Sequence, residues 1–256
     1  MRIATWNVNS VKARLPNILG WIRESAPDVL LLQELKGETD TFPRLEFEAL
    51  GYKAAVVGQK AYNGVAILSR HELYDIVDHL PGDETDSQAR YVEATVQGVR
   101  IASLYAPNGN PVDSAKYPYK LDWMKRLTAQ ATRLLENEQA VVLGGDFNVI
   151  PAEDDVYDPK GWEQDALFRP ETRAAFRALL HLGYTDAFRA LHPHQKQAYT
   201  FWDYQAGAWA RDNGLRIDHF LLSPEAVDRL KVIHIDRAPR GLDKASDHTP
   251  VVVELA

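Results

Sequence analysis

The amino-acid sequence predicts an α/β fold in which two mixed β-sheets pack against each other and helices cover the outside. Strand-like and helix-like segments alternate along the chain, which indicates strands joined through helices. Residues 91–97 and 99–105 are both strand-like and meet at Gly98, so a hairpin is expected as well. No low-complexity linker or short-period repeat interrupts the alternation, and we therefore expect residues 1–256 to form one domain.

Helical spacing follows the first expected strand, which covers residues 2–6. Apolar side chains recur every three or four residues between Leu15 and Ile22, and Pro27 ends the expected helix. Pro16 would then lie in the first turn, where proline is tolerated. The other elements expected up to residue 105 are a short helix over 43–50 and strands over 29–32, 52–57, 64–69, 73–79, 91–97 and 99–105.

The second half of the chain is expected to contain two amphipathic helices and the closing strands. Apolar side chains recur from Leu121 to Leu135, which predicts a helix over residues 117–137. It leads into an apolar run, Ala140 to Leu143, that is typical of a buried strand. Further elements are expected as a loop over 151–161, a helix over 171–182 and strands over 215–222, 231–236 and 249–255.

The composition is that of an ordinary soluble globular protein, with 45% hydrophobic and 25% charged residues. The absence of cysteine excludes disulfides, thiolate zinc sites and a cysteine nucleophile. We expect neither a secretory leader nor a membrane span, because no apolar run approaches about 18 residues, and a cytoplasmic location follows. The net charge of −7 disfavours tight nonspecific binding to nucleic acid, although a local basic face is compatible with it.

Residues 143–151, Leu-Gly-Gly-Asp-Phe-Asn-Val-Ile-Pro, contain the most informative polar pair. Asp146 and Asn148 lie two positions apart at the end of an expected strand, so their side chains point to the same side. Gly144 and Gly145 would let backbone and substrate approach closely there. The same letters also fit an ordinary turn, since Gly, Asp and Asn are common turn residues.

Polar side chains lie at the ends of several other expected strands. They are Asn7 and Asn9 after the first strand, Glu34 after the second, Tyr105 and Asn108 after the hairpin, Asp218 in a later strand, and Asp247 and His248 before the last strand. Strand ends of packed sheets often form ligand sites, because a rigid scaffold holds the residues there. The carboxylates and amides are oxygen donors, which favours a hard cation such as Mg²⁺ or Mn²⁺.

Each of these residues also has an interpretation without a ligand. These are helix capping for Asn7 and Asn9, simple solvation for Glu34, an ordinary strand aromatic for Tyr105 and a turn for His248. Asp218 is harder to explain in this way, because Asp is disfavoured in strands.

Six short motifs occur in a fixed order along the chain. They are Trp-Asn-Val-Asn-Ser (6–10), Leu-Gln-Glu-Leu-Lys (32–36), Tyr-Ala-Pro-Asn-Gly (105–109), Gly-Gly-Asp-Phe-Asn (144–148), Leu-Arg-Ile-Asp-His-Phe-Leu-Leu-Ser (215–223) and Ser-Asp-His-Thr-Pro (246–250). This set resembles the exonuclease III family of DNA-repair enzymes, in its bacterial form, within the endonuclease/exonuclease/phosphatase superfamily. Gly-Asp-x-Asn and Ser-Asp-His indicate only the superfamily, whereas Gln-Glu-x-Lys, Tyr-x-Pro-Asn and Thr-Phe-Trp (200–202) resemble the exonuclease III and AP endonuclease branch.

The resemblance implies a four-layered α/β sandwich and metal-dependent hydrolysis of DNA phosphodiesters. The implied activities are incision 5′ to an abasic site and removal of nucleotides or blocking groups from 3′ ends. Mg²⁺ or Mn²⁺ is the implied cofactor, and duplex DNA with abasic sites, nicks or 3′ blocks is the implied partner of a monomer. An RNA nuclease, a phosphatase for inositol or lipid phosphates, and a nucleic-acid-binding module without catalysis remain as alternatives.

The resemblance also implies roles for single residues. Around the metal it places Glu34 as principal ligand, with Asn7, Asp247, Asp146 and Asn148 nearby. For the chemistry it implies Asp146 and His248 as candidate bases, Asp218 behind His248, and Tyr105, Asn108 and Asn148 on the phosphate or the attacking water. The choice of base between Asp146 and His248 stays open.

An apolar pocket or wedge against an extruded sugar is expected from Phe201, Trp202, Leu215 and Ile217, with a packed strand pair as the alternative. Lys36 and Arg216 are candidates to bind DNA phosphates. Further basic candidates are Lys116, Lys120, Arg211, Arg229, Lys231, Arg237, Arg240 and Lys244. The chain departs from some relatives at Asn9, where they carry Asp, and at Leu215, where some AP endonucleases carry an aromatic residue.

Overall fold

Two mixed sheets of six strands each form the centre of the computed structural model, which describes residues 1–256. Sheet A has the order β11-β12-β1-β2-β4-β3, and sheet B has the order β5-β6-β7-β8-β10-β9. The strands of sheet A are β1 (Arg2–Asn7), β2 (Val29–Gln33), β3 (Lys53–Val57), β4 (Val65–Ser69), β11 (Leu230–Ile235) and β12 (Val251–Leu255). Those of sheet B are β5 (Tyr74–Val77), β6 (Tyr91–Val96), β7 (Val99–Tyr105), β8 (Val141–Asp146), β9 (Thr185–Asp186) and β10 (Asp218–Leu222).

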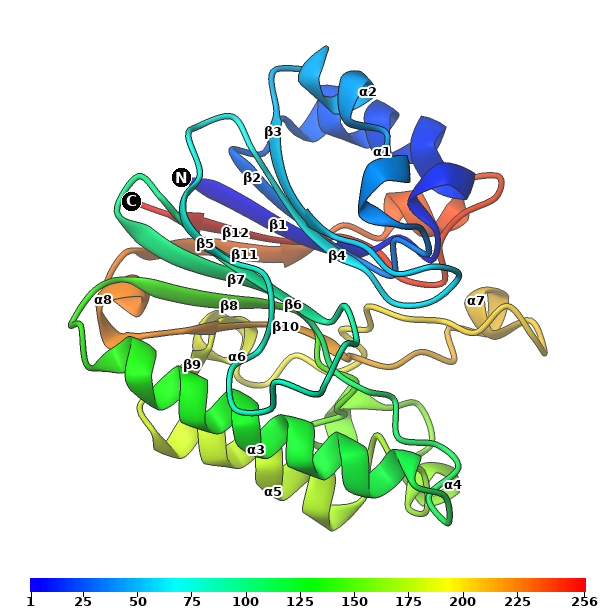
Figure 1. Cartoon of the computed structure of the whole chain (residues 1–256). Coiled ribbons are helices and arrows are strands. Elements are labelled where there is room, and N and C mark those ends of the chain that lie inside the picture. The colour runs from blue at the N-terminus through cyan, green and yellow to red at the C-terminus, as the bar shows by residue number, and fades with distance from the viewer.

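Helices cover the outer face of each sheet, so that four layers are visible in Figure 1. On sheet A they are α1 (Val11–Ser25) and α2 (Arg44–Glu48), and on sheet B they are α3 (Lys116–Leu135) and α5 (Pro170–His181). The shorter helices are α4 (Pro159–Trp162), α6 (Ala187–Leu191), α7 (Ala208–Arg211) and α8 (Pro224–Val227), with single 3₁₀ turns at Thr39–Thr41, Glu153–Asp155 and Ala238–Gly241. The expected four-layered sandwich is confirmed. No helix combines the length and the apolar character that a membrane crossing requires.

Apolar side chains are buried on both faces of each sheet. A cluster of 23 buried residues fills the space between the sheets, and clusters of 18 and 16 lie beneath the outer helices. Strands that are covered on both faces need apolar residues at every position rather than at alternate positions. The continuous run Val-Leu-Leu-Leu of β2, with all of its residues buried, is an example.

The strand directions bring the polar strand ends to one edge of the structure. β1 runs parallel to β2, and β7 runs parallel to β8, so the carboxyl ends of these four strands lie together. β10 is antiparallel to β8 and β12 is antiparallel to β1, so their first residues lie at the same edge. Asp218, for example, pairs directly with Asp146. The expected meeting of strand ends is therefore present.

The structure departs from the expected elements near two residues. α1 begins at Val11, after an N-cap at Ser10, so the prediction that Pro16 lies in the first turn is wrong. Pro16 lies inside the helix on its exposed side. The strand expected over residues 215–222 begins only at Asp218, because residue 215 instead bridges to two other segments. The hairpin is confirmed, with Gly98 at a φ of +77° in its turn.

Gly145 lies inside β8 at a position that excludes any side chain. Its φ is +153°, and a β-carbon added there would lie 2.0 Å from the carbonyl oxygen of Leu104. A β-carbon on Gly144 would in turn lie 2.5 Å from the ring of Phe220. The two glycines were expected to let the substrate approach closely. In the structure they instead let neighbouring residues of the protein pack closely against β8, whose last residue is Asp146.

Gly145→Ala is expected to lower the free energy of unfolding by about 3 kcal/mol or more, because it adds backbone strain to a steric overlap. Urea unfolding measures the change. Gly20→Ala is the matched control, since Gly20 lies in α1 and an added β-carbon meets nothing within 4 Å. That variant is expected to gain about 0.5–1 kcal/mol. Equal stabilities of the two variants would contradict the packing argument.

Candidate active site

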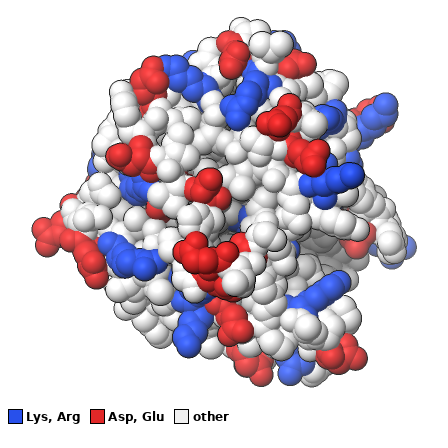
Figure 2. All heavy atoms as spheres, in the orientation of Figure 1, with Lys and Arg blue, Asp and Glu red and all other residues white.

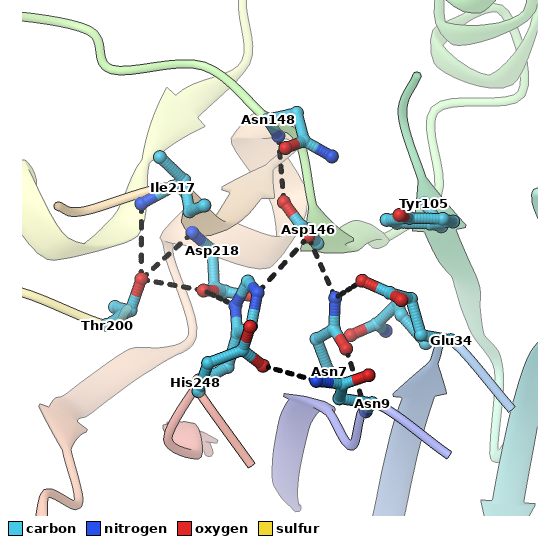
Figure 3. A network of polar contacts seen from close by, with 12 residues as sticks. Asn7, Asn9, Glu34, Tyr105, Asp146, Asn148, Thr200, Ile217, Asp218 and His248 are labelled. Atoms are coloured by element: carbon cyan, nitrogen blue, oxygen red, sulfur yellow. Dashed lines mark hydrogen bonds and ion pairs between the residues drawn. The ribbon is translucent and has the colours of Figure 1, made fainter. Parts of the chain in front are cut away.

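A pocket of about 530 Å³ opens at the edge where the strand ends meet. Ten of the residues singled out in the sequence line it, namely Glu34, Tyr105, Asn108, Asp146, Asn148, Phe201, Leu215, Ile217, Asp247 and His248. Asn7 and Asp218 lie directly behind this lining and bond to it, as Figure 3 shows. Trp202 and Arg216 do not reach the pocket.

Asn7 joins two carboxylates that belong to different sheets. Its side-chain nitrogen Nδ2 donates hydrogen bonds to Glu34 Oε1 and to Asp146 Oδ2, both at 2.9 Å. Asn7 is fully buried at the end of β1, so its side-chain amide is held in place and cannot turn towards solvent. Lys36 Nζ approaches the other oxygen of Glu34 at 3.0 Å, which further compensates the negative charge.

Asp146 is buried, and its carboxylate is held from two directions. Oδ1 accepts a hydrogen bond from the backbone nitrogen of Asn148 at 2.9 Å, and Oδ2 accepts the bond from Asn7. His248 Nε2 lies 3.7 Å from Oδ2. Burial, partly offset by the charge of His248, raises the pKa of Asp146 to about 7.

His248 lies between two carboxylates. Its Nδ1 is 2.8 Å from Asp218 Oδ2, and its Nε2 faces Asp146. Burial alone would lower the pKa of His248, but the charges of Asp218 and Asp146 outweigh it and raise the pKa to about 10. The imidazole is therefore a cation at neutral pH, with N–H groups on both sides.

Thr200 fixes the carboxylate behind the histidine and was missed in the sequence. Its hydroxyl donates a hydrogen bond of 2.6 Å to Asp218 Oδ2 and accepts bonds from the backbone nitrogens of Ile217 and Asp218 at 3.1 and 3.2 Å. The motif Thr-Phe-Trp drew attention only to its aromatic residues. The residues next to Thr200 in the sequence do not indicate that its hydroxyl binds Asp218, 18 positions later.

Five of the fifteen non-glycine residues with a positive φ lie at this edge. They are Asn9 (φ +45°), Ser10 (+90°), Glu34 (+54°), Lys36 (+54°) and Asn148 (+48°). Such left-handed conformations are costly outside glycine and persist where the surrounding structure holds them, most often at functional sites. Their presence here is an indication of function that does not depend on side-chain chemistry.

The donor set of the pocket fits a divalent cation that prefers oxygen. Ligand atoms of Glu34, Asp146 and His248 lie within 4.8 Å of one another. A protonated imidazole has no lone pair to offer, so the oxygens of the two carboxylates remain as the donors. Asp247 lies on the same pocket, where Asn9 Nδ2 donates a 3.1 Å hydrogen bond to its Oδ1. Asn9 thus orients Asp247, and Ser10 rather than Asn9 caps α1.

An apolar wall faces the carboxylates across the pocket. Leu215 bridges to Val156 on one side and to Phe201 on the other, and Phe201 bridges to the backbone of His248. The Phe201 ring also packs edge-on against the His248 imidazole, with 5.0 Å between the ring centroids. The wall is therefore attached to His248 through both backbone and side chain. Ile217 completes the wall.

Trp202 is not part of this wall, so its prediction as a substrate-binding residue is corrected. The side chain is fully buried on the other side of the segment, packed edge-on against Trp209 at 4.8 Å between ring centroids. Strand alternation is the reason, because Phe201 and Trp202 are adjacent and must point in opposite directions.

Arg216 is likewise buried and unavailable to DNA. Its guanidinium pairs with Asp155 at 2.6 Å and with Asp186 at 2.9 Å, and it donates to His219 Nδ1 at 3.1 Å. These contacts attach the segment before β10 to the loop after β8 and to β9. Arg216 therefore supports the apolar wall from behind and does not bind phosphate.

The other basic candidates are dispersed. Figure 2 shows Lys and Arg interspersed with Asp and Glu over one face, without a continuous basic patch. Lys120 is fully buried and also cannot contact a phosphate directly. Lys36 stays at the pocket rim, with a third of its side chain exposed and its nitrogen on Glu34.

Comparisons with known proteins agree on one family. Residues 4–248 match the endonuclease/exonuclease/phosphatase family. The chain is 33% identical to "DNA repair nuclease APEX1" of Danio rerio over 100% of this chain and 82% of the relative. The 3′ phosphatase NExo (D146N) from Neisseria, solved with a product DNA hairpin, has a TM-score of 0.98 and 41% identity over 100% of this chain and 99% of that one. An AP endonuclease from Archaeoglobus fulgidus has a TM-score of 0.96 and 36% identity over 100% and 99%.

The burial of His219 leads to a prediction of how the stability of the protein depends on pH. His219 is buried beneath the wall, with Nε2 on the carbonyl of Val149 and Nδ1 accepting from Arg216. Burial, and next the charge of Arg216, lower the pKa of His219 to about 4. The unfolded chain takes up this proton near pH 6.5. Stability is thus fully present above pH 6.5 and is lost as the pH falls towards 4, by about 3 kcal/mol.

Urea unfolding at several pH values measures this loss. His219→Gln is expected to show a smaller loss between pH 6.5 and 4 than the unsubstituted protein, whatever its stability at pH 8. His194→Gln is the control, because His194 is exposed in a loop and its substitution should leave the loss of stability between pH 6.5 and 4 unchanged. An unchanged slope in His219→Gln would contradict the assignment of a neutral buried imidazole.

Proposed function

The chain belongs to the endonuclease/exonuclease/phosphatase family, within the branch of exodeoxyribonuclease III and the AP endonucleases, and we propose that it repairs damaged duplex DNA. It is a phosphodiester hydrolase that cleaves 5′ to abasic sites and removes nucleotides or blocking groups from 3′ ends. The observation that supports this function best is the convergence of Glu34, Asp146 and His248 beside an apolar pocket. The printed functions of the relatives, a DNA repair nuclease, a 3′ phosphatase and an AP endonuclease, agree with it.

Glu34 is proposed as the principal ligand of the divalent cation, with Asn7, Asp146, Asn148 and Asp247 near it and supplying or orienting further oxygen atoms. Mg²⁺ is proposed as the main ion and Mn²⁺ as its substitute, because the available donors are oxygens. When bound, the cation neutralises charge on the phosphoryl oxygens. Asn7 keeps the two carboxylates at the separation that such a site needs, through its pair of 2.9 Å hydrogen bonds.

Asp146 is proposed as the residue that orients and deprotonates the attacking water. A general base must have a lone pair at the working pH, and His248, with a pKa of about 10, does not. Asp146, with a pKa of about 7, can take the proton near neutrality. The imidazolium of His248 is left to stabilise the negative charge that develops on the phosphoryl oxygens.

Tyr105 and two amides are proposed to complete the phosphate site. Burial and the neighbouring charges of Glu34 and Asp146 raise the pKa of Tyr105 well above its usual range, so the hydroxyl keeps its proton and can donate it. Asn108 and Asn148 line the same pocket, and Asn108 Nδ2 donates to Asn148 Oδ1 at 3.3 Å. These groups can hold the non-bridging and leaving oxygens in place.

The apolar wall is proposed to receive the sugar that lacks a base. A deoxyribose without its base exposes little polar surface, and Phe201, Leu215 and Ile217 offer an apolar surface beside the carboxylates. Nucleotides with a base would have to leave the stack to occupy the same place. The pocket therefore favours abasic sites and frayed 3′ ends over intact duplex.

The proposal extends to the setting in which the enzyme works. We propose that residues 1–256 act as one domain and as a monomer, because every residue of the site comes from a single chain. The substrates are duplexes with abasic sites, nicks or 3′ blocks. The cytoplasm is the proposed location.

Purified protein is expected to cleave a duplex with one abasic analogue and to release phosphate from a 3′-phosphate end. Both reactions should require Mg²⁺ or Mn²⁺ and stop when EDTA is added. Gel electrophoresis of labelled abasic, nicked and 3′-blocked duplexes, run side by side, measures the products. Intact duplexes together with hydrolysis of an inositol or lipid phosphate would overturn the proposed function.

Asp146→Asn is expected to lower turnover by about 10²- to 10⁴-fold, because the proton acceptor is lost while its shape is kept. DNA affinity, measured by fluorescence anisotropy on an abasic duplex, should stay within a few-fold. Asp122→Asn is the matched control, since Asp122 is exposed on α3 away from the pocket, and it should retain normal turnover. Near-normal turnover of Asp146→Asn would refute the role of Asp146.

A further inference from the structure

Lys120 has a buried amino group without an ion-pair partner, and burial lowers the pKa of this group to about 7. It lies in α3 with none of its surface exposed, among residues that pack against sheet B. Its ammonium donates hydrogen bonds to two backbone carbonyls, those of Asn108 at 3.0 Å and Asn148 at 2.5 Å. An ammonium is expensive to remove from water, and an apolar side chain of similar length would fill the space without that penalty. The use of lysine here therefore calls for an explanation other than packing.

The two carbonyls belong to separate loops that begin at neighbouring strands. Asn108 follows β7 and Asn148 follows β8, and these strands are parallel partners. The ladder ends with the bond from the Ala106 nitrogen to the Asp146 carbonyl, so beyond that point the sheet no longer holds the loops together. Lys120, in the second turn of α3, joins the two loops because its amine donates to one backbone carbonyl of each.

The side chains of these two residues point into the candidate active site. Asn108 Nδ2 donates to Asn148 Oδ1 at 3.3 Å, and Asn148 Nδ2 donates to the carbonyl of Ala106 at 2.8 Å. Asn148 also has a left-handed backbone, with a φ of +48°. Its orientation is thus strained and depends on contacts that hold it. The ammonium bond to its own carbonyl is the shortest of those contacts.

Gly109 indicates that the lysine is fitted closely to the loop. A β-carbon on Gly109 would lie 2.7 Å from Lys120 Cδ, so the loop passes directly over the lysine side chain. The φ of Gly109 is +90°, a conformation that turns the carbonyl of Asn108 towards the helix. Loop and lysine are therefore complementary in shape as well as in hydrogen bonding.

We propose that Lys120 is a positioning residue, which clamps the loops after β7 and β8 so that the Asn108 and Asn148 amides face the scissile phosphate. The inference rests on the proposed function for its catalytic consequence, although the clamp itself is a property of the fold. Lys120 is fully buried away from the substrate, and its hydrogen bonds go to backbone carbonyls rather than to the carboxylates of Glu34, Asp146 or Asp247. Its loss should therefore affect turnover and leave the metal requirement unchanged.

Lys120→Met is expected to lower kcat on an abasic duplex by about 10- to 100-fold, because small misplacements of positioning groups have effects of this size. The Mg²⁺ concentration for half-maximal rate should stay within about twofold, since Glu34 keeps its bond to Asn7. Lys125→Met is the matched control, because Lys125 is exposed on the same helix. A purely structural role predicts a lower melting temperature with unchanged kcat for the folded fraction, and that result would overturn the proposal.

Chemical restoration of the amine separates the clamp from general packing. The chain has no cysteine, so Lys120→Cys contains a single thiol. Alkylation of the unfolded variant with 2-bromoethylamine, followed by refolding, joins the sulfur to an aminoethyl group, releases bromide and places an ammonium where the lysine had it. Recovery of kcat to within a few-fold of the unsubstituted protein supports the clamp, and a refolded product that stays as slow as the unmodified variant overturns it. Lys120→Gln, which keeps a side-chain NH₂ group as donor, replaces Lys120→Met if the latter does not fold.

Hydrogen exchange tests the clamp without any enzymatic activity. In Lys120→Met, backbone amides of residues 108–110 and 147–150 should exchange about tenfold faster, while those of β7 and β8 stay protected. Unchanged exchange in both loops would overturn the clamp. Faster exchange in a protein that cleaves none of the duplexes would support the clamp and reject the proposed function, so the two failures are distinguishable.

Discussion

The hydrogen bonds of one buried amide are the constraint on which the site depends. Asn7 belongs to sheet A, and it binds a carboxylate that follows its neighbour β2 and another at the end of β8 in sheet B. Two carboxylates repel each other when they are brought together in a buried place. The amide hydrogen bonds compensate part of this repulsion. They also hold the end of β1 in sheet A against the end of β8 in sheet B. Tight packing at Gly145 and the continuous apolar strands allow the sheets to approach closely enough for Asn7 to reach both.

The two titratable groups of the site, Asp146 and His248, have different protonation behaviour because their surroundings differ. Asp146 is desolvated, which makes its carboxylate more basic, whereas His248 is flanked by Asp218 and Asp146 and remains cationic. Thr200 makes this possible, because its hydroxyl fixes the carboxylate behind the histidine. One environment thus produces a proton acceptor and a permanent positive charge a few ångströms apart, a combination that hydrolysis of a phosphodiester can use at neutral pH.

Prediction from the sequence worked where a signal was local. Asp146 and Asn148 lie two positions apart at the end of an apolar strand. Glu34 follows another such strand and His248 precedes the last one, so their shared edge followed from the strand pattern. It failed where a partner is distant in the sequence. Arg216 has the same local appearance as a surface arginine, and only the loop that carries Asp155 and the short strand that carries Asp186 make it a buried one. Lys120 and Thr200 follow the same rule, since the atoms they bind belong to other segments.

The pairing of the first strand with the last has a consequence for biosynthesis. β1 pairs with β12, with Arg2 opposite Glu254, and His248 immediately precedes β12. The centre is therefore incomplete until residues 248–255 have been synthesised and β12 has paired with β1. A polypeptide that ends before residue 248 lacks both this histidine and the strand that pairs with β1. Contacts so distant in the sequence also make the last step of folding comparatively slow.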